Sequence, residues 1–142
     1  MAKVCAVGKV RGFGTVNIYV TGSDAAVSTD VVAKVQEIVA KQRELNVDVL
    51  VANAQRTACN MSVTVYAEDG YSSSEVKALL SKAFADYVNS IPIGGTFHLA
   101  ELGAKLVATG CINNYTWNTD MQDVTATKSQ CFTVGTVTIG VK

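Results

Sequence analysis

The segment from Ser72 to Val88 carries the strongest periodic pattern in the chain. Ser72 and Glu75 have the spacing of a capping box, in which each side chain satisfies a backbone N–H of the other residue. The apolar residues of the segment recur at helical spacing and form one continuous stripe: Val76, Leu79, Leu80, Ala83, Phe84, Tyr87 and Val88. The pattern therefore predicts an amphipathic helix that packs on another element.

Three earlier segments alternate between apolar and polar residues, which is typical of half-buried strands. Their apolar faces are Val16, Ile18 and Val20 in the first, Val47, Val49 and Val51 in the second, and Cys59, Met61, Val63 and Val65 in the third. Between the first two, Ser28 or Thr29 caps a helical pattern. Its apolar positions also recur at helical spacing: Val31, Val32, Val35, Ile38 and Val39.

The only proline, Pro92, and the pair Gly94–Gly95 end the long helix and form a tight connection. The remaining elements are expected to be a short helix at about 98–109 closed by Gly110, a strand at 111–117, a polar loop at 118–130 and a strand at 131–141. In the last strand the apolar positions change phase at Gly135. We expect a bulge there that keeps Val134 and the later apolar residues on the core face.

This order of elements predicts an α+β fold with two small lobes, each a mixed or antiparallel sheet with helices packed on one face. Residues 11–54 are expected to form a strand–helix–strand lobe. Residues 55–142 are expected to form a strand–helix–helix–strand–strand lobe. The 142 residues, of which 49% are hydrophobic, are enough to bury such cores.

The glycines at Gly12 and Gly14 raise the question of a phosphate-binding loop. In dinucleotide-binding loops the glycines follow a strand and precede a helix, because the helix N-terminus binds the pyrophosphate. Here they precede a strand, no third glycine stands at the required offset, and no Walker sequence is present. We interpret them as a turn that needs an unusual backbone angle. Gly94–Gly95 does precede a helix, but a connecting turn is the favoured interpretation there too.

The polar residues indicate no reaction chemistry. His98, the only histidine, has no nucleophile beside it in the sequence and is interpreted as part of the start of the third helix. Glu68–Asp69, Asp120 and Asp123 are interpreted as solvated turn residues. The cysteines form no CxxC pair, so we expect free buried thiols, no metal site and no cofactor: Cys5, Cys59, Cys111 and Cys131.

The charge balance limits the classes of binding partner that the sequence favours. Twelve basic residues offset twelve acidic ones, so nothing favours binding to nucleic acid or to an anionic membrane. No apolar run approaches the roughly 18 residues that cross a bilayer, and the start lacks the apolar region of a signal peptide. We therefore expect synthesis and retention in the cytosol. A net charge of zero also leaves self-association open.

Four segments resemble the C-terminal part of baseplate J-like proteins, the wedge components of contractile phage tails and related tail-like particles. They are RGFGTVNIYV at 11–20, RELNVDVLVANAQRTACNMSVTVY at 43–66, NSIPIGGTFHLAELGAKLVATGCIN at 89–113 and VGTVTIGV at 134–141. The most telling pieces are Arg-Gly-x-Gly-Thr-Val and the Pro-x-Gly-Gly turn before a leucine-bearing helix. One departure is Glu44, since family members commonly carry proline after the arginine at that point.

The resemblance implies a structural function without catalytic residues or cofactor. Such proteins associate with other wedge subunits in a ring around the tail hub, first in the host cytoplasm and then in the virion or prophage-derived particle. The family's full proteins are longer, so residues 1–10 would be the end of a preceding segment, with an added strand. We expect Tyr19, Tyr66 and Trp117 to be exposed and to contribute to interfaces.

Two other functions stay open. One is a cytosolic regulatory module that binds a small molecule between its lobes, which a metabolite would stabilise thermally. The other is an enzyme that uses His98, which would require an alanine at that position to change a measurable property.

Overall fold

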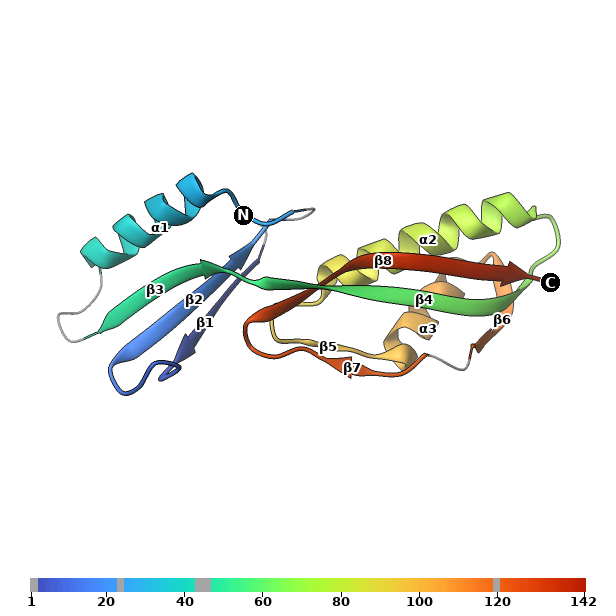
Figure 1. Cartoon of the computed structure of the whole chain (residues 1–142). Helices are drawn as coiled ribbons and strands as arrows, with labels where there is room; N and C mark the ends of the chain where they lie inside the picture. The colour runs from blue at the N-terminus through green and yellow to red at the C-terminus, as the bar shows by residue number, and fades with distance from the viewer. Residues whose placement is uncertain (1–2, 23–24, 43–46, 119–120) are drawn as a thin grey trace. The chain divides into compact units, whose positions relative to one another are not determined.

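The computed structural model describes residues 3–22, 25–42, 47–118 and 121–142 (Figure 1). It confirms the expected α+β fold, with helices and with mixed and antiparallel sheets. The chain divides into two compact units. The first comprises the chain up to Thr57 with the short pieces Pro92–Gly95 and Ala126–Cys131, and the second comprises the rest.

The first unit contains a three-stranded sheet in the order β1-β2-β3. Its elements are β1 (Lys3–Gly8), β2 (Thr15–Thr21), α1 (Thr29–Gln42) and β3 (Asp48–Asn53). Strand β1 is antiparallel to β2, and β2 is parallel to β3. The Ser28 hydroxyl accepts a hydrogen bond at 3.4 Å from a backbone N–H in the first turn of α1, as expected for an N-cap.

Helix α1 is joined to β3 by the side-chain amide of Gln36. Its Nε2 donates to the Val49 carbonyl at 2.8 Å, and its Oε1 accepts from the Val51 N–H at 2.6 Å. The amide thus satisfies backbone groups of a strand that has β2 as its only sheet neighbour among the described residues. Two of the expected apolar positions of α1, Val31 and Ile38, are exposed.

The second unit is built on a sheet in the order β6-β4-β8. Its elements include β4 (Gln55–Ala67), α2 (Ser73–Ser90), α3 (Leu99–Ala108), β6 (Ile112–Trp117) and β8 (Gln130–Val141). Strands β4 and β8 both begin in the first unit. Strand β6 is antiparallel to β4, whereas β8 runs in the same direction as β4 (Figure 1). The sheet is therefore mixed.

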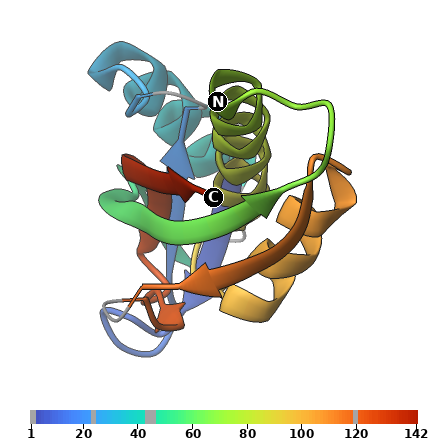
Figure 2. The same cartoon turned by 90° about the vertical axis from the view of Figure 1, so that its right-hand side faces the viewer.

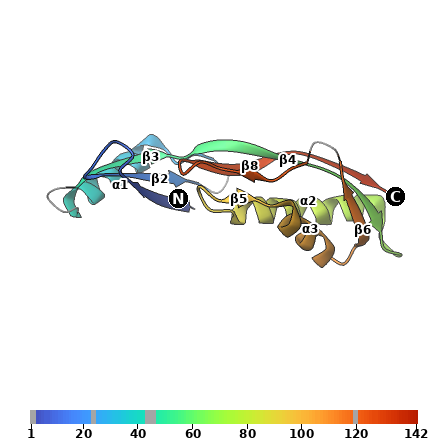
Figure 3. The ribbon, with the colours of Figure 1, turned by 90° about the horizontal axis from the view of Figure 1, so that it is seen from below.

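Helices α2 and α3 lie on one side of this sheet (Figure 3), and α3 lies beside β6 (Figure 2). The capping box at the start of α2 is present, with Ser72 and Glu75 bonded to each other's backbone. The fully buried residues of the core include Val76, Leu80, Phe84 and Val88 from α2, Leu102 and Leu106 from α3, and Met61, Val63 and Val65 from β4. Leu79, expected in the apolar stripe, is exposed instead.

Two short strands were not expected from the sequence. Strand β5 (Thr96–Phe97) pairs antiparallel with β7 (Val124–Thr125), which lies in the segment interpreted as a polar loop. Each has only two residues, so neither contains enough alternation to produce a pattern.

The β4–β8 pair contains one irregularity. The Lys142 N–H donates to the Val65 carbonyl at 2.9 Å, and its carbonyl accepts from Ala67, which is the parallel pattern. At the other end of the pair, the Gln55 N–H donates to the Ser129 carbonyl at 2.8 Å. Between these bonds β8 has one residue more than β4, as a bulge requires.

The position of Val134 differs from the expectation. Its side chain is 42% exposed, and burial alternates without interruption from Thr133 to Val141. The break in alternation falls between Cys131 and Phe132, which are both buried. The expected phase change at Gly135 is therefore wrong as a description of burial. A single valine in a threonine-rich strand is a weak indicator of the buried face.

No helix in the described ranges is long and apolar enough to span a membrane.

Candidate functional site

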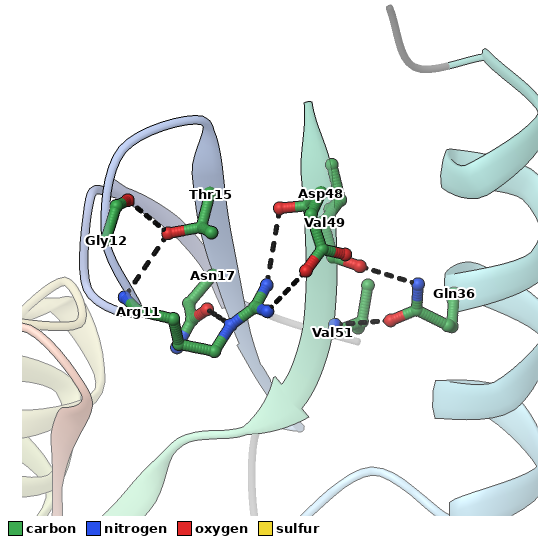
Figure 4. A network of polar contacts seen from close by, with 8 residues as sticks. All are labelled: Arg11, Gly12, Thr15, Asn17, Gln36, Asp48, Val49 and Val51. Carbon is green, nitrogen blue, oxygen red and sulfur yellow. Dashed lines mark hydrogen bonds and ion pairs between the residues drawn. The ribbon is translucent and has the colours of Figure 1, made fainter. Parts of the chain in front are cut away.

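Arg11 is the centre of a polar network in the first unit (Figure 4). Its Nε donates to Asn17 Oδ1 at 2.8 Å, and its Nη1 lies 2.6 Å from Asp48 Oδ2. A second guanidinium nitrogen, Nη2, donates to the Asp48 carbonyl at 3.3 Å. Asn17 is only 6% exposed, and its Nδ2 donates a hydrogen bond to the Tyr19 hydroxyl at 3.1 Å. Arg11 thereby joins the loop after β1 to both β2 and β3.

The loop from Lys9 to Gly14 is closed by its own backbone and by Thr15. The Thr15 hydroxyl donates to the Gly12 carbonyl at 2.7 Å, and the Lys9 N–H donates to the Thr15 carbonyl at 2.8 Å. Gly12 and Gly14 have φ values of 117° and 74°, where a side chain would be strained. Polar groups of the loop thus bind one another, and the guanidinium of Arg11 is paired with Asp48. These contacts close the loop as a turn, and the Arg11 guanidinium binds the Asp48 carboxylate.

The backbone N–H groups of the second glycine pair, Gly94–Gly95, also form hydrogen bonds with backbone carbonyls. The Gly94 N–H donates to the Gln130 carbonyl at 2.9 Å, and the Gly95 N–H donates to the Pro92 carbonyl at 3.0 Å. Gly94 has a φ of 77°. Strand β5 separates the pair from α3, so these N–H groups are not part of a helix N-terminus that could bind an anion.

His98 lies at the start of α3, next to a carboxylate that the sequence did not connect with it. It is the N-cap residue, but its side chain makes no capping bond. Asp123 supplies the cap instead: its Oδ1 accepts from the Leu99 N–H at 2.8 Å, and its Oδ2 lies 3.6 Å from His98 Nδ1. Asp123 is exposed, as interpreted from the sequence, but it also caps a helix and lies beside a histidine, which the sequence did not indicate. Asp120 lies outside the described residues.

A tyrosine and a second carboxylate complete this group. The Tyr87 hydroxyl accepts from the His98 N–H at 2.9 Å and donates to Glu101 Oε2 at 3.0 Å. Burial raises the pKa of Tyr87 above its usual value. These contacts attach α3 to α2. They involve the backbone N–H of His98 and not its imidazole ring. We read the group as a structural brace.

Asp123 makes the start of α3 sensitive to acid. The Leu99 N–H, followed by His98, lowers the pKa of Asp123 below its usual value. A depressed pKa in the folded state contributes stability above the unfolded pKa, and this contribution is lost as the pH falls through the folded value. We expect Asp123→Asn to be less stable than wild type at pH 7 in urea unfolding, with the difference shrinking by pH 3. The matched control, Asp69→Asn on an exposed turn, should show no such convergence.

The four cysteines are unpaired and differ in accessibility. Cys59, Cys111 and Cys131 are buried, whereas Cys5 in β1 is half-buried. Burial raises the pKa of Cys59 to about 11, which suppresses its thiolate at neutral pH. Within the described ranges, no group of three metal-ligand side chains is close enough to hold an ion.

We therefore expect one thiol to react quickly with a chromogenic disulfide reagent under native conditions. The other three should react only after unfolding. Cys5→Ser should abolish the fast phase and leave the slow phases unchanged. Two or more fast thiols in the wild type would contradict this assignment.

The three aromatic residues expected at interfaces are not equally accessible. Tyr66 on β4 is 37% exposed. Trp117 on β6 is half-buried and packs against Tyr115, with ring centroids 5.1 Å apart. Tyr19 is half-buried too, because it packs against the small apolar cluster of Ala54, Ile93 and Cys131. The expectation that all three are exposed is therefore correct for Tyr66 alone.

The face of the β6-β4-β8 sheet opposite its helices carries mostly uncharged polar side chains, with Val134 exposed on the same face. The residues with hydroxyl or amide groups are Asn60, Ser62, Thr64, Tyr66, Asn114, Thr116, Thr136 and Thr138. Asn118 links two of them, with its Nδ2 2.6 Å from Ser62 Oγ and its Oδ1 3.4 Å from Thr64 Oγ1. A hollow of about 530 Å³ opens here and is also lined by Met61, Phe97 and Met121. The sequence had shown the alternation but not that, among the described residues, no helix covers this face.

Comparison with known protein families finds a match to part of the chain. The family described as the baseplate J-like protein C-terminal domain matches residues 59–140. The matched segment begins in β4 and ends in β8, so it contains α2, α3 and β6 completely. No curated protein matches the chain.

Proposed function

Because the chain belongs to the baseplate J-like protein C-terminal domain family, we propose that it is an assembly module that associates with other wedge subunits of a tail baseplate. Family membership supports a structural role in a phage baseplate, and the proposal adds the wedge partners and the absence of catalysis. Its place would be the host cytoplasm during assembly and the virion tail afterwards. The family match carries this proposal.

The sheet face of the second unit that no described helix covers supports an assembly role. Its eight hydroxyl and amide side chains can exchange hydrogen bonds with a neighbouring subunit without the cost of burying a charge. Tyr66 adds an amphipathic ring to this face. We propose that this face lies against another tail protein.

Immunogold electron microscopy of tail particles tests the proposal. An antibody against this chain should place gold at the end of the tail opposite the head. Gold on the head, along the sheath, or only on soluble material in the lysate would contradict a baseplate position. Particles from a strain that lacks the gene serve as the control.

The hollow on the sheet face favours a second candidate, the binding of a small uncharged polar molecule. Its lining combines amide and hydroxyl groups with the side chains of Met61, Phe97 and Met121. A ligand at one hundred times its Kd would stabilise the fold by about 2.7 kcal/mol. A thermal-shift screen of neutral metabolites at millimolar concentration distinguishes the two functions, because an assembly module should not respond.

A further inference from the structure

The loop between β1 and β2 exposes two apolar side chains at its tip. Phe13 is 90% exposed and Val10 is 51% exposed. A phenylalanine that is almost entirely in water leaves its large apolar surface hydrated, and large apolar groups of this kind anchor many protein interfaces. The same loop contains the Arg-Gly-x-Gly-Thr-Val motif, with Phe13 at the variable position.

The tip is held in one conformation rather than loosely tethered. Arg11 fixes it to Asn17 and Asp48, and Thr15 closes it from within. The Gly14 carbonyl also accepts from the Asp48 N–H at 2.8 Å. A side chain presented on a braced loop loses little conformational entropy when it binds, so the loop is preorganised as a docking element.

The charge at the tip indicates which chemical groups a partner's binding surface needs. Lys9 Nζ lies 5.0 Å from the centre of the Phe13 ring, within cation–π range. The charge of Arg11 is neutralised by Asp48, whereas no described carboxylate forms an ion pair with Lys9. The tip therefore presents an apolar ring beside one uncompensated positive charge. Its complement is an apolar pocket with a carboxylate on its rim.

We propose that Phe13, Val10 and Lys9 form a docking anchor that inserts into an acid-rimmed apolar pocket on a different protein subunit of the baseplate. The inference rests on the proposed function, because the partner is taken to be a neighbour in the same particle. A second copy of this chain is a poorer complement. Tip-to-tip contact would bring Lys9 against Lys9, and the hollow near Met61 has no carboxylate among its lining residues.

The test uses tail particles from a source strain whose own gene carries the change. Phe13→Ala should lower the amount of this chain in purified particles by about tenfold or more, as expected for a central aromatic anchor. Its thermal midpoint should not change, because the ring makes no buried contacts. Phe13→Leu should restore most of the incorporation. The control, Val107→Ala, removes a side chain that is 45% exposed on α3 and should have no effect.

Photo-crosslinking identifies the partner. With benzoylphenylalanine at position 13, the particles should yield a crosslink to a different tail protein, at an apolar site with an aspartate or glutamate nearby. A crosslink to a second copy, no crosslink above that from position 107, or normal incorporation of Phe13→Ala would each overturn the anchor while leaving the proposed function intact. Absence of the wild-type chain from the particles would overturn the proposed function and the anchor together.

Discussion

Replacement of Phe84 by alanine is expected to lower the free energy of unfolding by about 3–5 kcal/mol, the largest loss of any single change considered for this chain. Phe84 lies on α2, is fully buried, and meets Phe97 of β5 edge to face with ring centroids 6.4 Å apart. Phe97 in turn contacts Tyr87 and Phe132. Removal of the ring would leave a cavity among rigid aromatic neighbours that cannot collapse to fill it.

Urea unfolding followed by circular dichroism measures the loss. The matched control is Leu79→Ala on the same helix, where the side chain is 39% exposed and less than about 1 kcal/mol should be lost. Equal losses at the two positions would mean that α2 does not bury the face that contains Phe84. The comparison is informative because both residues belong to the stripe predicted from the sequence.

The start and the buried face of α2 could be predicted from the sequence because the information is local. The capping box needs only Ser72 and Glu75, which are three residues apart, and both side-chain bonds are present. Periodicity then identifies the apolar face but not its limits. Leu79 lies at the margin of the stripe, where one rotational step around the helix separates buried from exposed positions.

The polar contacts could not be predicted, because they join residues that are distant in the sequence. Arg11 and Asp48 are brought together only when β2 and β3 pair in parallel. Asp123 reaches Leu99 only because β7 pairs with β5. Each of these side chains taken alone looks like an ordinary exposed polar residue. The alternation in β2 did indicate that Asn17 faces away from its valines, but not that this face is covered.

Gly103 lies inside α3, where a glycine is unfavourable for a helix, and the packing of Tyr115 explains its presence. A glycine inside a helix lowers the local preference for helix, yet α3 runs through it without interruption. A β-carbon there would collide with the Tyr115 hydroxyl and would lie 2.6 Å from the ring carbon that bears it. The glycine lets β6 place its tyrosine directly against the helix. Only the pairing of α3 with β6 makes this visible.

Gly135 is the site of the second large effect, a loss of about 2–3 kcal/mol on substitution by alanine. A β-carbon at this position would lie 2.8 Å from the carbonyl oxygen and 3.1 Å from the carbonyl carbon of Cys59. Rotation of a side chain cannot relieve a collision with backbone, so β4 and β8 would have to separate. The added carbon would also collide with Asn60 Oδ1, which accepts a hydrogen bond from the Thr136 N–H at 2.8 Å.

Gly140→Ala on the same strand isolates this cause. A β-carbon there would meet Thr64 Oγ1 at 3.6 Å, an ordinary van der Waals contact. Because alanine also reduces the conformational freedom of the unfolded chain, the change should be neutral or stabilise by about 0.4–1 kcal/mol. Opposite signs for the two glycines in urea unfolding would locate the close approach of β8 to β4 at Gly135. A similar loss at both would mean that the strand tolerates no added side chain anywhere, and that the contact with Cys59 is not the reason for the glycine.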